Sequence, residues 1–149
     1  MLKKSHHTPK TTRGERVLAE VAQAAGLRDL RWHDATLAGT PDLAAPAERV
    51  ALFFHGCFWH AHEHCSCARV PRTNRPFWER KFEANRARDR RVVAELERKG
   101  WRVIALWECG VLDHTVEELA EELRGLLDGG AVYGEIWSYE RRPRWQLSC

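Results

Sequence analysis

The sequence contains no long hydrophobic run. No apolar stretch approaches the roughly 20 residues that a helix needs to cross a lipid bilayer, and no signal-peptide core follows the charged start of the chain. These absences exclude an integral membrane protein and predict a cytoplasmic one. Repeats and low-complexity blocks are also missing, and 149 residues suit one compact domain. Residues 1–12, which are polar and basic, are expected to form a flexible arm ahead of a single domain over residues 13–149.

The chain also lacks a strong net charge. It has 24 Lys and Arg against 21 Asp and Glu, so its formal charge of +3 does not by itself indicate a polyanionic partner. The charges are nevertheless segregated. Basic residues crowd into residues 3–16, 69–75, 86–91 and 141–144, whereas acidic residues gather in 117–122. This separation predicts one basic face that contacts DNA and an acidic helix remote from it.

Hydrophobic periodicity predicts a small α/β protein. Helices are expected over residues 14–25, 76–100 and 115–127, the last one starting with a capping box formed by Thr115 and Glu118. Strands are expected over residues 30–33, 49–54 and 101–107, and residues 39–42 form a turn. Alternating helices and strands in this order predict a small mixed central sheet flanked by helices.

Histidine and cysteine are concentrated in residues 55–67, where four His and three Cys occur within 13 residues. In a reducing compartment such cysteines are metal ligands or free thiols rather than disulfides. Zinc prefers a closed tetrahedron of Cys and His ligands, and a bound ion would give this polar segment a fixed shape. The candidate ligands are Cys57, His62, Cys65 and the distant Cys109. Free thiols and solvated imidazoles are the alternative, which this density makes improbable.

Two carboxylates are candidates for a second metal site. Cleavage of a phosphodiester needs a divalent cation, which carboxylates at rigid strand or helix ends can hold. Asp42 lies just before a predicted strand, and Glu15 lies in the first turn of a predicted helix. Each also has an ordinary explanation, because Pro-Asp pairs are common in turns and acids are favoured in any first helical turn.

Several separated motifs occur in a characteristic order: GTPD at 39–42, HGCFWH at 55–60, PRTNRPFW at 71–78, ARDRR at 87–91 and GWRVIALWEC at 100–109. Together they resemble the very-short-patch repair endonucleases over about residues 15–109. The resemblance implies a restriction-endonuclease-like fold with a structural zinc loop and a catalytic magnesium ion. It also implies a monomer that acts on double-stranded DNA and nicks it beside a T·G mismatch left by deamination of 5-methylcytosine.

The resemblance further implies roles for individual residues near the magnesium ion. Asp42 becomes the metal-binding carboxylate, and the backbone carbonyl of Phe54 is a further candidate ligand. His60 becomes the catalytic imidazole, which agrees with the ordinary pKa of histidine near neutral pH. Glu15 and His55 become supporting catalytic residues. A histidine so close to the zinc loop could instead be a spare zinc ligand.

For zinc, the resemblance leaves two histidines in competition. His62 is preferred because its spacing from Cys57 matches the family pattern, whereas His64 directly precedes Cys65. Cys67 remains a possible substitute ligand.

Aromatic and basic side chains are the candidate DNA contacts. An aromatic wedge can enter a base stack at a cost of a few kcal/mol, and the resemblance suggests this use for Phe58, Trp59 and Trp78. For Trp78 a core position is equally compatible with the sequence. Arg86 and Arg90 are expected to contact phosphates, which position a protein without specifying sequence.

Two other functions fit the same sequence. A restriction-like or phage-defence endonuclease of the same fold would act on another DNA target, and fold alone does not separate the two. A zinc-stabilised DNA-binding module without catalysis is the third possibility. The presence of Glu15, Asp42, His55 and His60 argues against it, because a pure binder has no chemical need for them.

Overall fold

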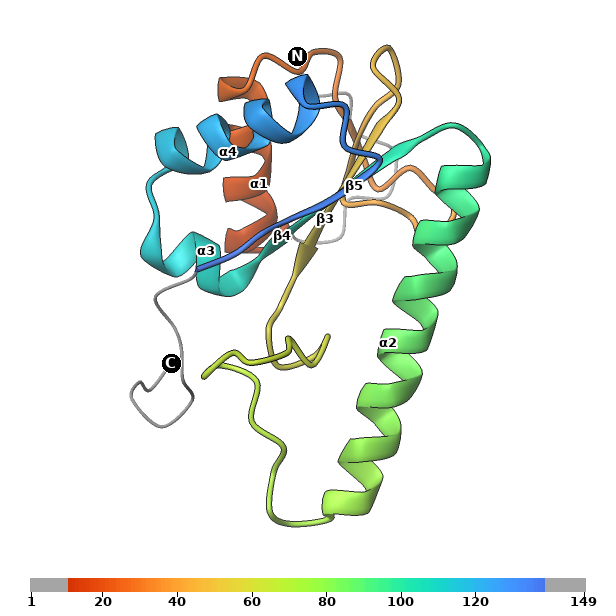
Figure 1. The fold of residues 1–149 in the computed structure, drawn as a ribbon, viewed down its shortest axis with the longest axis vertical. Coiled ribbons are helices and arrows are strands. Elements are labelled where there is room, and N and C mark those ends of the chain that lie inside the picture. Colours follow the sequence, from red (N-terminus) through yellow and green to blue (C-terminus); the bar gives the residue numbers. More distant parts are fainter. Residues whose placement is uncertain (1–10, 139–149) are drawn as a thin grey trace.

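A mixed sheet forms the centre of the protein in a computed structural model, which describes residues 11–138 (Figure 1). Its five strands lie side by side in chain order: β1 (Arg31–Trp32), β2 (Leu43–Ala45), β3 (Val50–His55), β4 (Arg102–Trp107) and β5 (Tyr133–Ile136). β2 pairs antiparallel with both β1 and β3, while β4 pairs parallel with both β3 and β5. The predicted α/β class and mixed sheet are confirmed.

Helices cover both faces of this sheet (Figure 1). They are α1 (Arg13–Ala24), α2 (Arg75–Arg98), α3 (Glu108–Asp113) and α4 (Val116–Asp128). α1 and α4 pack together on one side, and α2 lies on the other. α4 starts with the predicted capping box of Thr115 and Glu118, and α1 starts with an equivalent one formed by Thr12 and Glu15. In the described part of the chain no helix could span a membrane.

The apolar core lies mainly between the sheet and the pair α1 and α4. Leu18, Leu52, Ile104, Leu119 and Leu123 are all at most 1% exposed there. On the other face of the sheet, Ala51 of β3 and Val103 of β4 pack with Leu96 of α2. β3 is therefore covered on both faces, as its continuous apolar run predicts.

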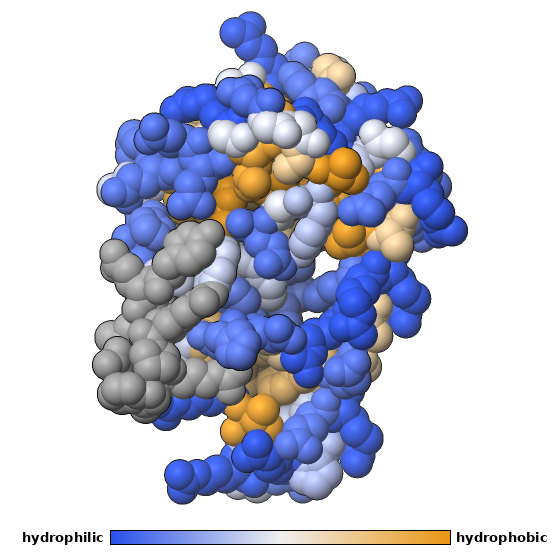
Figure 2. All heavy atoms as spheres, viewed as in Figure 1, coloured by the Kyte–Doolittle hydropathy of each residue, from blue (hydrophilic) through white to orange (hydrophobic). Residues whose placement is uncertain are grey.

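α2 is much less buried than the other long helices. Phe82 and Leu96 are its two buried residues, and Figure 2 shows hydrophilic side chains along it on the right of the view. Only its C-terminal part packs on the sheet, around Leu96. Its N-terminal half therefore extends past the end of β3 and flanks the segment that holds the candidate site (Figure 1).

The sequence does not predict β2, α3 or β5. β2 has three buried residues, too few to show a period, and α3 follows β4 without an intervening turn residue. β5 contains Gly134, which is a poor strand residue. A Cβ at Gly134 would lie 2.9 Å from Leu126 of α4, so close packing against that helix explains the glycine.

Candidate active site and metal centre

The candidate residues converge because β3 and β4 are parallel. Their C-terminal ends lie at the same edge of the sheet, where His55 is paired with Trp107. Each strand continues directly into cysteine-containing sequence, Cys57 after β3 and Cys109 after β4. The strand register thus brings Cys109 to the His/Cys segment, although the two are far apart in the sequence.

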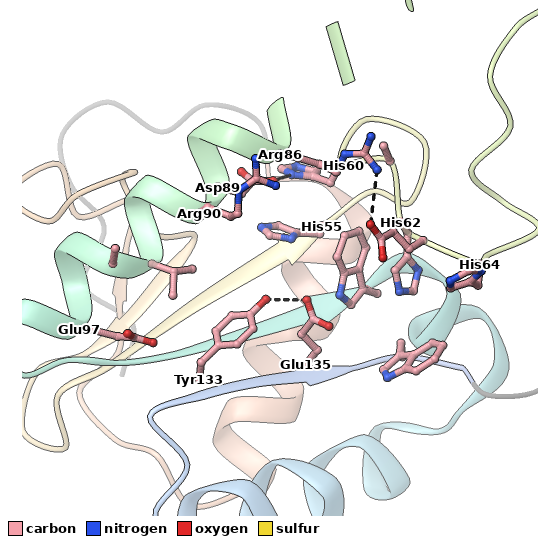
Figure 3. A pocket seen from close by; sticks show the side chains of 16 residues that line it. His55, His60, His62, His64, Arg86, Asp89, Arg90, Glu97, Tyr133 and Glu135 are labelled. Atoms are coloured by element: carbon pink, nitrogen blue, oxygen red, sulfur yellow. Dashed lines mark hydrogen bonds and ion pairs between the residues drawn. The ribbon is translucent and has the colours of Figure 1, made fainter. Parts of the chain in front are cut away.

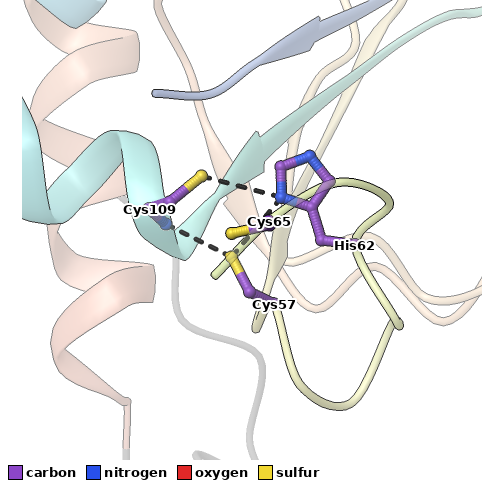
Figure 4. A group of neighbouring side chains, drawn as sticks. All are labelled: Cys57, His62, Cys65 and Cys109. Carbon is purple, nitrogen blue, oxygen red and sulfur yellow. Dashed lines mark hydrogen bonds between the residues drawn. The ribbon is translucent and has the colours of Figure 1, made fainter. Parts of the chain in front are cut away.

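A buried cluster of one imidazole and three thiols forms at this edge (Figure 4). The ligand atoms of Cys57, His62, Cys65 and Cys109 all lie within 4.8 Å of one another. The Nδ1 atom of His62 is 3.6 Å from the Sγ atoms of both Cys57 and Cys109. Three thiolates and one imidazole are a ligand set that zinc favours, and this cluster could hold such an ion.

Backbone amides also point at the sulfur atoms. The N–H of Cys109 donates to Cys57 Sγ, and the N–H of Ser138 donates to Cys109 Sγ, each at 3.4 Å. Hydrogen bonds from Cys57 and His62 lower the pKa of Cys109. The side-chain hydrogen bond between Cys57 and Cys109 raises the pKa of Cys57, and burial raises it further. A bound cation would stabilise the thiolate form of these buried, closely spaced cysteines.

The competing zinc ligands occupy different places. His62 is buried in the cluster, whereas His64 is exposed and outside it, with a left-handed φ of 56°. Cys67 lies near Cys57 and Glu108 in a different group.

A cavity of about 410 Å³ brings together most of the predicted catalytic residues. Asp42, Phe54, His55 and His60 line it, and α2 contributes Asp89. The Oδ2 atom of Asp42 accepts a 2.7 Å hydrogen bond from the N–H of Phe54. Burial raises the pKa of Asp42 to about 6, and the nearby charge of Glu15 acts in the same direction. An added cation would relieve both effects.

His60 is held in a fixed orientation within this cavity. The backbone N–H of His60 donates to the Gly56 carbonyl at 3.1 Å, and the ring atom Nδ1 lies 2.7 Å from Asp89 Oδ2. Burial acts to raise the pKa of Asp89, but the hydrogen bond and charge of His60 lower it overall. The sequence alone misses Asp89, because it stands among four arginines in a helix that is interpreted as a basic surface.

Glu15 and His33 lie close to Asp42, and one ligand atom from each of the three side chains lies within 4.8 Å of the others. His33 Nε2 is 3.8 Å from Glu15 Oε1 and 3.9 Å from Asp42 Oδ1. His33 is not among the site residues that the sequence predicts. The signal that could have found it is its position opposite Asp42 across the β1–β2 pair, which requires the register to be known.

The candidate DNA-contacting aromatics form one cluster with α2. Phe58 packs against Trp59, Trp78 and Phe82 with ring centroids 5.0, 5.4 and 5.1 Å apart. Trp59 is 54% exposed. Phe77, which the sequence does not predict as a DNA contact, is 50% exposed. The predicted phosphate contacts pair with acids: Arg86 with Glu63 and Glu83, and Arg90 with Glu83.

His55 and His60 also border a second cavity of about 540 Å³ (Figure 3). On its far side β5 contributes Tyr133 and Glu135, whose side chains are hydrogen-bonded to each other. Trp107 lies between the catalytic candidates and the cysteine cluster. Its ring stacks on His62 at 3.9 Å and meets His55 edge-on at 5.0 Å.

These features define a mixed-sheet α/β protein in which a Cys/His cluster that could hold a metal ion adjoins a cavity of imidazoles and carboxylates. The family model for the DNA mismatch endonuclease Vsr matches residues 2–67. The chain belongs to the Vsr family of DNA endonucleases, because relatives 32% to 42% identical to it match about four fifths of its length. It is 42% identical to the type II nicking enzyme V.XorIIP of Xanthomonas oryzae pv. oryzae, over 80% of this chain and 85% of that protein.

Two further relatives are comparably covered. The DNA mismatch endonuclease Vsr of Escherichia coli is 39% identical over 82% of this chain and 79% of that protein. The type II nicking enzyme V.NmeAIP of Neisseria meningitidis is 32% identical over 80% of this chain and 85% of that protein. The shared coverage extends well beyond the zinc loop, so the resemblance of the separated motifs is confirmed at the level of the family.

Proposed function

We propose that this endonuclease is magnesium-dependent, acts as a monomer and nicks one strand of double-stranded DNA beside a T·G mismatch. The observation that carries the proposal is the single cavity lined by Asp42, His60 and Asp89. It contains a carboxylate for a metal ion next to an imidazole–carboxylate pair for proton transfer. The names of the relatives, a mismatch endonuclease and nicking enzymes, support both the mismatch and the single-strand cut.

The residues present fit two different ions. The thiolate-rich cluster suits zinc in a structural role, whereas the carboxylates of Asp42 and Glu15 and the Phe54 carbonyl are oxygen ligands of the kind magnesium prefers. The elevated pKa of Asp42 is consistent with a site that a cation stabilises. Magnesium, when bound, would polarise the scissile phosphate and neutralise developing charge.

His60 would move the proton. Because its Nδ1 is engaged by Asp89, its Nε2 is the atom left to accept the proton of the attacking water. Asp89 fixes the ring and stabilises the imidazolium that results, as a buried carboxylate does in other acid–base pairs. His55, neutral and stacked on His60, would maintain the ring position without competing for the proton.

The aromatic cluster would supply mismatch preference. A T·G pair stacks weakly, so side chains enter the helix there at lower cost than at a Watson–Crick pair. Trp59 is the most exposed member of the predicted wedge, while Phe58 is held behind it by Trp78 and Phe82. The Asn85 side chain donates to the Trp59 carbonyl at 2.8 Å, which anchors the wedge on α2. Arg86 and Arg90 on the same helix would contact phosphates.

A cleavage assay on matched duplexes tests the proposal. Two duplexes that differ only in T·G against T·A at one position, each labelled on either strand, are incubated with the zinc-loaded protein and magnesium. We expect one nick on the thymine strand of the T·G duplex. The Asp42→Ala variant should bind the duplex but leave it uncut.

The remaining outcomes identify the alternatives. Equal cleavage of the T·A duplex, or cuts in both strands, would indicate a restriction-like enzyme. Binding without cleavage of any duplex would indicate the inactive DNA-binding module.

A further inference from the structure

The Nε2 atom of His33 lies 3.8 Å from Glu15 Oε1 and 3.9 Å from Asp42 Oδ1, the two carboxylates of the proposed magnesium site. We propose that the imidazole of His33 is a third protein ligand of the cleavage-site cation, which makes the site a mixed nitrogen and oxygen site that binds Mn²⁺ as well as Mg²⁺ and binds Mn²⁺ more tightly. This inference rests on the proposed function, since it assumes that Asp42 holds the catalytic metal ion.

The strand register places His33 beside Asp42. Arg31 pairs with Ala44 and Trp32 with Leu43, so the next pair along the ladder is His33 with Asp42. The backbone confirms this, because the His33 N–H donates to the Asp42 carbonyl at 3.1 Å. Directly opposed residues in an antiparallel pair have adjacent side chains on the same face. The His33 backbone is left-handed, with a φ of 47°.

Each carboxylate is fixed so that its second oxygen faces the imidazole. The Oε2 atom of Glu15 accepts the N–H of Thr12 at 2.9 Å, and the Oδ2 atom of Asp42 accepts the N–H of Phe54 at 2.7 Å. These bonds leave Glu15 Oε1 and Asp42 Oδ1 directed toward His33 Nε2. Such backbone bonds to the outer atoms of ligands are how proteins orient a metal site.

The separations suit a metal ion. Ligands about 2.1 Å from an octahedral ion lie about 3 Å apart when adjacent and about 4.2 Å apart when opposite. The distances from His33 Nε2 to the two oxygens, 3.8 and 3.9 Å, fall between these limits. The three side chains are 17% to 19% exposed, which leaves a route for the ion.

The nitrogen ligand predicts a metal preference. Magnesium favours oxygen ligands throughout, whereas imidazole raises the affinity for first-row transition ions. Wild-type protein should therefore bind Mn²⁺ more tightly than Mg²⁺. His33→Asn, which removes the imidazole but tolerates a positive φ, should weaken Mn²⁺ binding at least about tenfold, the lower scale for loss of a site-orienting group.

The test uses Mn²⁺ as the probe in zinc-loaded protein without DNA. Titration followed by electron paramagnetic resonance gives the affinity, and electron spin echo modulation reports directly bonded ¹⁴N in the wild type itself. We expect ¹⁴N coupling in the wild type, its loss in His33→Asn, and its persistence in His55→Gln, which removes one of the other imidazoles that line the cavity with Asp42.

The controls separate this inference from the function on which it rests. Mn²⁺ that depends on Asp42 but shows no ¹⁴N coupling, or coupling that survives in His33→Asn, would overturn the role of His33 alone. Undiminished Mn²⁺ binding by Asp42→Ala would overturn the proposed metal site and with it this inference. Since the wild-type coupling is measured without a substitution, poor folding of a variant does not affect that result.

Discussion

The imidazole rings of His55 and His60 are stacked face to face, with centroids 3.9 Å apart and planes 6° from parallel. Two protonated rings at that distance would repel strongly. Burial and the neighbouring His60 lower the pKa of His55 to about 3, so His55 is neutral at physiological pH. The stacked pair therefore does not hold two charged rings, and Asp89 Oδ2 lies 2.7 Å from the Nδ1 atom of His60.

From this pair we predict that His60→Ala lowers the single-turnover cleavage rate at least about 100-fold with the fold intact, the usual scale for a lost general acid or base. Asp89→Asn should have a smaller effect, because it weakens the orientation of the ring without removing it. His114→Ala, a histidine outside the cavity, is the matched control. A normal rate for His60→Ala would refute its role as the general base.

Zinc content should distinguish His62 from His64. We expect one zinc ion per chain in the wild type and in His64→Ala, but well under one in His62→Ala, because only His62 lies in the cluster. Losing even about 3 kcal/mol of metal-binding free energy lowers the melting temperature by roughly 6–12 °C in a protein of this size. Elemental analysis and thermal unfolding measure both effects, and equal zinc loss in the two variants would refute the ligand set.

Magnesium affinity should depend on pH through Asp42. The proton and the cation compete for this carboxylate, whose pKa is about 6 in the metal-free protein. Affinity should be constant above about pH 7 and fall up to tenfold per pH unit below 6. Calorimetric titration with Mg²⁺ across pH 5 to 8 would show it, and a pH-independent affinity would count against Asp42 as a ligand.

The raised pKa of Asp42 also determines how the stability of the metal-free protein changes with pH. Its pKa in the folded state exceeds the ordinary value of 3.8, so the folded protein binds the proton more tightly than the unfolded chain. This contribution to stability is present below about pH 4 and is lost as the pH rises through 6. Asp42→Asn should therefore stabilise the magnesium-free protein at pH 8 and have little effect at pH 4, as measured by urea unfolding.

Gly14→Ala should destabilise the protein by about 1–3 kcal/mol, the usual cost of overpacking a filled site. A Cβ there would lie 2.2 Å from the ring of Phe54, which packs under the first turn of α1. Gly125→Ala in α4 is the control, since a Cβ there meets no atom within 4 Å. It should stabilise by about 0.5–1 kcal/mol, because alanine is the better helix former. If Gly14→Ala stabilises the protein as Gly125→Ala does, the Phe54 ring can move aside at no cost and the overpacking argument is wrong.

The sequence predicts most of the regular structure because its signals are local. The periodicity of α1 and the capping box of α4 locate both helices to within about one residue, and the apolar runs locate β3 and β4. The sequence does not predict β2 and β5, because strands of three and four residues are too short to show a hydrophobic period.

Sites can be predicted when the residue types themselves are diagnostic. Cysteine and histidine at high density indicate a metal cluster, and the parallel ends of β3 and β4 explain why Cys109 joins it. His33 and Asp89 carry no such signal, because their roles depend on a strand register and on the orientation of α2. The N-terminal arm and the basic stretch at 141–144 lie largely outside the described residues, so their predicted roles remain predictions.

The parallel pairing of β3 with β4 has a consequence for the order of assembly during synthesis. Leu52 and Ile104 are neighbours in the sheet, yet the whole cysteine-rich segment and α2 are made between them. Pairing of strands so distant in the chain is slow, because loop closure must precede any gain from the contact. Cys57 and Cys109 are brought together only at this late stage, so a nascent chain that ends before β4 holds an incomplete cysteine cluster. The cluster of Cys57, His62, Cys65 and Cys109 is therefore complete only after more than two thirds of the 149 residues have been made.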